Sequence, residues 1–196
     1  MDGRSPIPHP AEALGHRFRF WLALAAVAGI AVSLWGLNSL SADLDHHGKS
    51  YNEFQTAGSG IGNLVQAWPR DVRATAVQAV WSDIGFAVAY GLAGVLALGL
   101  MADKVAARPR SRFRGLSSSF FAVASWLILG AAIADLLESV LLLTVLATFG
   151  TGHSVSNLGA ATQTVGLVKW GLVGLTGLML FQAAILVVPI APVPEA

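Results

Sequence analysis

Four long apolar stretches divide the 196-residue chain, at about 18–38, 79–101, 119–149 and 165–190. A helix needs roughly 20 predominantly apolar residues to cross the ~30 Å hydrocarbon core of a membrane. The pattern therefore predicts an all-α integral membrane protein, a bundle of four transmembrane helices forming one domain over 1–196. The first stretch is longer than the apolar part of a signal peptide, so we expect it to remain as a span.

The segment at 39–78 is too polar to span and too long for a simple turn. Its apolar residues recur at helical spacing, which predicts amphipathic helix; they are Phe54, Ile61, Leu64, Val65 and Trp68. Pro69 should interrupt any helix that reaches it. We expect one or two short helices that lie over the outer mouth of the bundle or on the outer leaflet.

Composition agrees with the apolar pattern. Hydrophobic residues make up 55% of the chain and charged residues only 12%, against about 25% in soluble domains. The chain has no cysteine, which excludes disulfides and thiol chemistry. The net charge is +1 and the basic residues lie beside apolar stretches, so membrane lipids are expected partners and nucleic acid is not. No cofactor is predicted.

Basic residues gather on one predicted side of the membrane. The segment at 102–117 is basic and the N-terminal region adds Arg4, Arg17 and Arg19, whereas 150–164 has no lysine or arginine. Positively charged loops stay in the cytoplasm. The pattern therefore predicts a multi-pass protein with both termini cytoplasmic and the segment at 39–78 outside.

Polar residues interrupt each span at a similar depth. At about 1.5 Å per residue, five of them lie roughly 24–28 Å from the inner ends of their spans; these are Asn38, Asp83, Asp135, Glu138 and Lys169. Ionised groups at such depth face the protein interior or water. Lys169 is the basic residue among these five, so we expect it to pair with Asp135 or Glu138. Two other interpretations stay open: the acids clamp helix register, or Asp83 and Lys169 reach the interface.

Tyr90 lies seven residues after Asp83, so both belong to one helix face. It either lines a route below the polar layer or bonds to a neighbouring helix. Glycines at 91 and 94, and at 171, 174 and 177, predict close helix packing within the bundle or in a homo-oligomer.

The segment SADLDHHGKS contains weak candidates for metal ligands. Asp43, Asp45, His46 and His47 have suitable side chains, and His153 lies in another outer loop. Adjacent histidines rarely bind one ion together, and no second ligand pair has a recognisable spacing. A solvated polar loop is the better interpretation, and no metal site is predicted.

Three short stretches resemble a family of bacterial four-helix membrane proteins of unknown activity. They are AW at 67–68, DIGFAVAYGLA at 83–93 and AAIADLLESVLLLTVL at 131–146. In that family an Asp and a Tyr mark the second span, and Asp-x-x-Glu-Asn-x-x-Leu-Leu marks the third. Asp83, Tyr90, Asp135 and Glu138 match those positions, whereas Ser139 replaces the asparagine. The resemblance implies a four-span protein of the bacterial cytoplasmic membrane and no particular activity.

The polar layer supports three hypotheses about function. The first is a protein that binds or moves a small ligand, ion or proton at an outer-leaflet site formed by Asp83, Tyr90, Asp135, Glu138, Lys169 and Asn38. The alternative is an intramembrane enzyme on a lipid or isoprenoid, with Asp135 or Glu138 as acid and Asp83 assisting. The third is an accessory subunit that docks in a membrane complex. A hydrophobic small molecule is a further expected partner.

Overall fold

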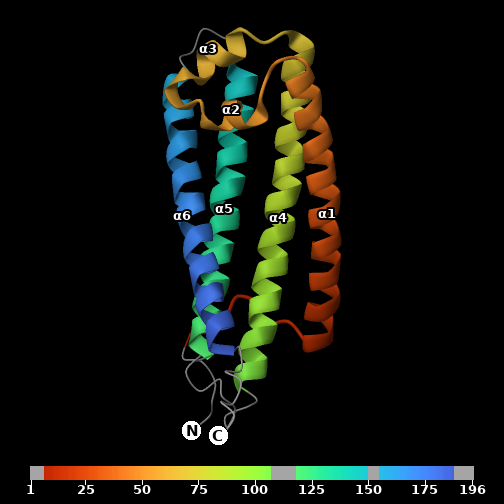
Figure 1. The fold of residues 1–196 in the computed structure, drawn as a ribbon, viewed down its shortest axis with the longest axis vertical. Coiled ribbons are helices and arrows are strands. Elements are labelled where there is room, and N and C mark those ends of the chain that lie inside the picture. Colours follow the sequence, from red (N-terminus) through yellow and green to blue (C-terminus); the bar gives the residue numbers. More distant parts are fainter. Residues whose placement is uncertain (1–6, 107–117, 150–154, 188–196) are drawn as a thin grey trace, which may run out of the picture.

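The computed structural model describes residues 7–106, 118–149 and 155–187, which are helical apart from short connections. Four long helices run the length of the molecule, and three short helical segments lie across one end (Figure 1). In chain order they are α1 (His16–His46), α2 (Tyr51–Thr56), η1 (Gly58–Gly60), α3 (Ile61–Gln66), α4 (Arg70–Ala106), α5 (Ser118–Thr148) and α6 (Ser156–Val187).

The four long helices are the predicted spans. Each is long and apolar enough to cross a membrane, which confirms a polytopic helical architecture in length and composition. α4 has 37 residues and so extends over about 56 Å, well beyond the ~30 Å of a hydrocarbon core. The long helices therefore project past the apolar stretches that identified them.

The ends of the long helices differ from the predicted span boundaries, because the helices continue past the apolar runs. α1 continues to His46, α4 begins at Arg70 rather than 79, and α6 begins at Ser156 rather than 165. Backbone hydrogen bonding continues wherever no proline or cap stops it, whereas an apolar run ends at the first polar residues. The connection between α1 and α4 is accordingly shorter than the predicted segment at 39–78. The predicted basic segment beyond residue 106 and the end of the fourth span beyond 187 lie outside the described residues.

The long helices pack in chain order as a row. The extensive contacts join α1 to α4, α4 to α5 and α5 to α6, which leaves α1 and α6 at the two edges. Of the apolar windows, 39% of α4 and 44% of α5 are buried, against 6% of α1 and 11% of α6. The predicted bundle is therefore an open arrangement around the α4–α5 pair, and the edge helices present most of their apolar surface outward.

One end of the row, here called the capped end, is covered by α2, η1 and α3. The apolar residues that predicted these helices turn toward the long helices: Phe54, Ile61, Val65 and Trp68 are buried in one core with residues of α1, α4 and α5. This matches the first of the two predicted placements. Pro69 stops α3 and precedes α4, and its carbonyl accepts the first backbone bond from Arg73.

Two glycines allow the cap to touch α6 directly. Gly58 has φ +55°, a backbone conformation that favours glycine, and its carbonyl lies against Gly159 of α6. A Cβ atom on Gly159 would collide with that carbonyl. The cap is therefore fixed to α6 through close backbone contact as well as through apolar side chains.

The opposite end, here called the N-terminal end, is covered by residues 7–15. The indole N–H of Trp126 donates to the carbonyl of Pro8 at 3.0 Å, and His9 packs against Gly99 of α4. Arg19 forms an ion pair with Asp103 of α4, with Nη1 and Oδ2 2.7 Å apart. The apolar pattern of the sequence did not indicate this set of contacts.

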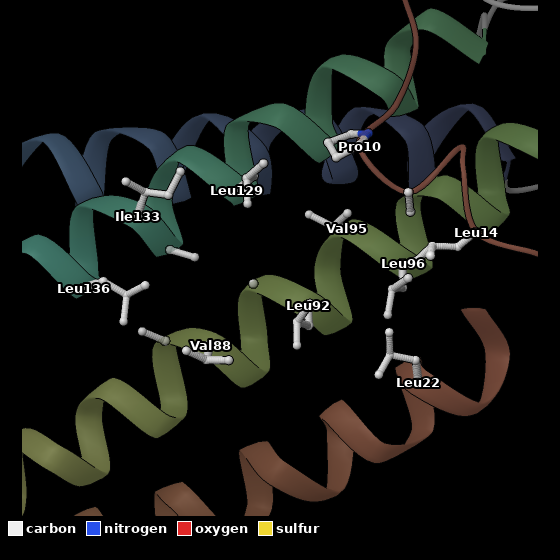
Figure 2. A pocket seen from close by; sticks show the side chains of 14 residues that line it. Pro10, Leu14, Leu22, Val88, Leu92, Val95, Leu96, Leu129, Ile133 and Leu136 are labelled. Atoms are coloured by element: carbon white, nitrogen blue, oxygen red, sulfur yellow. The ribbon is translucent and has the colours of Figure 1, made fainter. Parts of the chain in front are cut away.

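A cavity of about 320 Å³ lies between α1, α4 and α5 near the N-terminal end. Figure 2 shows Val88, Leu92 and Val95 of α4 opposite Leu129 and Ile133 of α5. Leu22 of α1 and three residues of the N-terminal segment complete the lining, which consists of apolar side chains and one glycine. The cavity is thus a dry, apolar space on one side of the α4–α5 pair.

Candidate functional site

The centre of the candidate site is an ion-paired group of three side chains from two helices. The ammonium of Lys169 on α6 donates to Oδ1 of Asp135 on α5 at 3.0 Å. The same nitrogen lies 2.5 Å from Oε2 of Glu138. All three residues are buried. The predicted pairing is present, and it includes both acids instead of one.

Helical spacing explains why both acids reach one lysine. Asp135 and Glu138 are three residues apart, so they project from one face of α5, the face that packs against α6. Gly166 precedes Lys169 by one turn, and a Cβ there would lie only 3.0 Å from Oε1 of Glu138. The glycine therefore leaves room for the Glu138 carboxyl between the helices.

Asp83 of α4 joins this group from the side of the cap. Its Oδ2 accepts a hydrogen bond from the amide of Gln55 at 2.9 Å and one from the hydroxyl of Tyr51 at 3.2 Å. Burial, reinforced by the neighbouring Asp83 carboxyl, raises the pKa of the Tyr51 hydroxyl above its ordinary value. Tyr51 therefore remains a proton donor to Asp83 at ordinary pH.

Asp83 also interacts electrostatically with Asp135, Lys169 and Glu138. The polar group is thus one continuous cluster rather than two separate pairs, and we call these four ionisable residues, with Tyr51 and Gln55, the polar cluster. Two of the three carboxyl groups, those of Asp135 and Glu138, form ion pairs with the Lys169 ammonium, and no ion pair to Asp83 is formed among the described residues. If all were ionised, two negative charges would lack a countercharge in a buried region.

Two more polar side chains of α4 and α5 border the cluster. The Tyr90 hydroxyl interacts with Asp135 without reaching good hydrogen-bond geometry. The hydroxyl of Ser139, next to Glu138, is fully buried and also lacks a hydrogen-bond partner in the described structure. Buried polar atoms are normally satisfied by protein, water or ions. These two hydroxyls therefore add unsatisfied hydrogen-bonding capacity beside the acids.

Most of the predicted site residues meet in the polar cluster, whereas Asn38 does not. Asn38 is exposed on α1, and no hydrogen bond or ion pair joins it to the cluster in the described residues. It lies two residues after Gly36, which packs on Ser82 of α4, so its side chain is about 200° away around the helix. A shared depth was thus not sufficient to place Asn38 at the site.

Tyr51 and Gln55 were missed as site residues. They lie four apart on α2, so they share a helix face. The sequence did contain a signal for them, because they form a polar pair on a helix that was expected to cover the mouth of the bundle. The prediction considered only the apolar residues of that helix.

The acidic and histidine residues at the C-terminal end of α1 do not converge. Oδ2 of Asp43 accepts from the Thr75 hydroxyl at 3.0 Å, and Nδ1 of His47 lies 2.9 Å from the Asp43 carbonyl. Asp45 and His46 are exposed. Within the described ranges no three such side chains are grouped to hold a metal ion, and His153 lies outside them.

The polar cluster and the apolar cavity occupy different faces of α4. Tyr90 is seven residues after Asp83 and shares its face, whereas Leu92, nine residues after Asp83, points about 180° away. The cavity lining includes none of the acids. The arrangement is therefore suited to binding a proton or a small cation among the acids, and separately to holding an apolar group in the cavity.

Comparison with known proteins adds no functional information. The chain matches no known protein family, no curated protein and no solved structure. The resemblance of 83–93 and 131–146 to four-helix membrane proteins accordingly stays a prediction.

Proposed function

We propose that this protein binds a proton or a small cation at the polar cluster and moves it across the membrane. The supporting observation is the excess of acid: Lys169 forms ion pairs with Asp135 and Glu138, and the buried Asp83 adds a third carboxyl that interacts electrostatically with them. Uncompensated charge is costly at membrane depth. A bound proton or cation relieves that cost, and its release restores it.

The path into the cluster begins at Gln55. This residue is half-buried at the surface of the cap, and its amide bonds directly to Asp83. Asp83 in turn interacts with Asp135, which pairs with Lys169. We infer that a proton or cation enters at Asp83 from the solution and passes from there to the more deeply paired acids.

The proposed orientation places the capped end outside. Arg17 and Arg19 of α1 and Lys104 of α4 lie at the other end, and positive residues favour the cytoplasmic side. The protein is then a multi-pass protein of the bacterial cytoplasmic membrane with cytoplasmic termini. In this orientation the polar cluster receives its ligand from outside.

The test is the uptake of protons or sodium ions into liposomes that contain the purified protein. We expect a pH-sensitive dye or radioactive sodium to report uptake that falls to the level of protein-free liposomes in Asp83→Asn and Glu138→Gln. Asp71→Asn on the same helix and Glu53→Gln in the cap remove exposed acids and should leave uptake unchanged. Uptake in Asp83→Asn and Glu138→Gln equal to that of the unmodified protein would reduce the polar cluster to a structural clamp.

The enzyme alternative has weaker support from the geometry. An acid that protonates a lipid or isoprenoid must face a space that admits the substrate. None of the acids lines the described apolar cavity, and Asp135 and Glu138 face α6. The accessory-subunit alternative has the exposed apolar faces of α1 and α6, which suit lipid as well as protein.

A further inference from the structure

We propose that the apolar cavity between α1, α4 and α5 binds one acyl chain of a phospholipid from the leaflet at the N-terminal end. This site is distinct from the polar cluster and does not depend on the function proposed for it. The lining, the length and the opening of the cavity, and the charges near its closed end, all fit such a chain.

The lining selects an apolar ligand. Its side chains are hydrocarbon throughout, apart from Gly91, so it has no side-chain donor or acceptor for a polar molecule (Figure 2). The cavity also lies within the stretches of α4 and α5 that are apolar enough to span a membrane. Hydrocarbon, and not water, is therefore the medium beside it, and burying a chain in it restores dispersion contacts that an unfilled space lacks.

The length of the cavity fits one leaflet. Its wall on α4 runs from Ala87 to Leu96, which is about 14 Å along a helix. Half of a ~30 Å hydrocarbon core is about 15 Å, the depth that the acyl chain of one leaflet occupies. A single chain that lies parallel to α4 therefore matches the wall.

The cavity opens sideways toward the membrane. Val88, Leu92 and Ile133 at its rim are exposed, whereas Val95 and Ala132 in its floor are buried. The opening exists because α1 packs mainly on α4 and leaves a wedge between itself and α5. A lipid chain can enter this wedge from the bilayer without passing through water, and it would give α1 a second surface to pack against.

The N-terminal end supplies the charge that favours a phospholipid over a neutral apolar molecule. Pro10, Ala11 and Leu14 close the cavity there, and the Trp126 bond to Pro8 holds that segment in place. Arg17 and Lys104 are exposed at the same end of α1 and α4. Basic residues at a membrane surface attract the phosphate of a headgroup.

Native mass spectrometry tests the proposal on the full-length protein, purified in mild detergent and then washed with a delipidating detergent. We expect the unmodified protein to retain one phospholipid. Ile133→Trp and Val88→Trp place a large side chain from the rim into the cavity. In both, retention should fall by about tenfold or more, the loss expected when about two buried methylene groups lose their place.

Leu137→Trp is the matched control, because Leu137 is exposed one turn from Ile133 on α5 and does not line the cavity. It should retain the lipid, as should Asp83→Asn, which alters only the polar cluster. Circular dichroism verifies that each variant is helical. The proposal is overturned if the unmodified protein retains no lipid, if the retained mass is a neutral isoprenoid, or if helical Ile133→Trp and Val88→Trp retain phospholipid as Leu137→Trp does.

Discussion

The two faces of the α4–α5 pair differ in how they fit a membrane environment. The face that carries Asp83, Tyr90 and Asp135 is covered by α6 and by the cap, and both of its carboxyl groups accept hydrogen bonds from protein donors. The face that carries Leu92 and Ile133 has an apolar cavity open to the bilayer. Hydrocarbon cannot satisfy a carboxyl group but packs well against leucine, so only the polar face needs protein cover.

The polar face is covered by additional structure. α2, η1 and α3 bury a whole core of their own against the long helices, and Gly58 approaches Gly159 of α6 at backbone contact. The apolar face has no comparable cover, and α1 remains an edge helix there. Three substitutions, taken from the largest expected effect to the smallest, examine this contrast.

Lys169→Met should have the largest effect, because it leaves Asp135 and Glu138 buried without their cation. Breaking a buried ion pair by removing one partner costs about 3–5 kcal/mol. The free energy of unfolding, measured by denaturant titration in detergent, should fall by that amount. Lys104→Met, at an exposed lysine of α4, should change it by less than about 0.5 kcal/mol.

The triple variant Lys169→Met, Asp135→Asn, Glu138→Gln sharpens this result. Once the acids are neutral, the missing ammonium no longer leaves a charge unpaired, so much of the lost stability should return. A single Lys169→Met variant as stable as the unmodified protein would mean that the acids are hydrated, and the contrast between the two faces would fail.

Gly91→Val should have an intermediate effect, on the packing between α4 and α5. A Cβ at Gly91 would lie 2.6 Å from the Cβ of Ala132, so the helices must separate. Overpacking of this kind costs about 1–3 kcal/mol and should lower the thermal unfolding midpoint. Gly174→Val on α6, where no atom lies within 4 Å of the added Cβ, is the control and should leave the midpoint unchanged. Equal effects at both positions would contradict the distinction between central and edge helices.

Tyr51→Phe should have the smallest effect, about 1 kcal/mol, through loss of the hydrogen bond to Asp83. This loss should also depend on pH. Because the pKa of folded Tyr51 is raised, its contribution is fully present below the unfolded pKa of about 10 and is lost as pH rises above that value. The difference in unfolding free energy between the unmodified protein and Tyr51→Phe should therefore shrink between about pH 9 and 11. A difference that stays constant over this range would show that Tyr51 ionises freely.

Part of the polar cluster can be predicted from the positions of residues along the sequence. The apolar runs predict the helices, and the rise per residue predicts that Asp83, Asp135, Glu138 and Lys169 lie at one depth. The three-residue spacing of Asp135 and Glu138 places them on one face whatever the neighbours are. Asn38 shows the limit of that reasoning, because depth says nothing about the direction in which a side chain points around its helix.

Helix content, span number and relative depth are local properties, set by hydrogen bonding within each helix and by the length of each apolar run. The order α1–α4–α5–α6, the approach of Tyr51 and Gln55 to Asp83, and the cavity beside Ile133 are not local. They depend on which helix faces meet, and several faces of each span are apolar enough to pack against either protein or lipid. Contacts between residues distant in the chain, such as Gly58 with Gly159 and Gly91 with Ala132, select one arrangement among these.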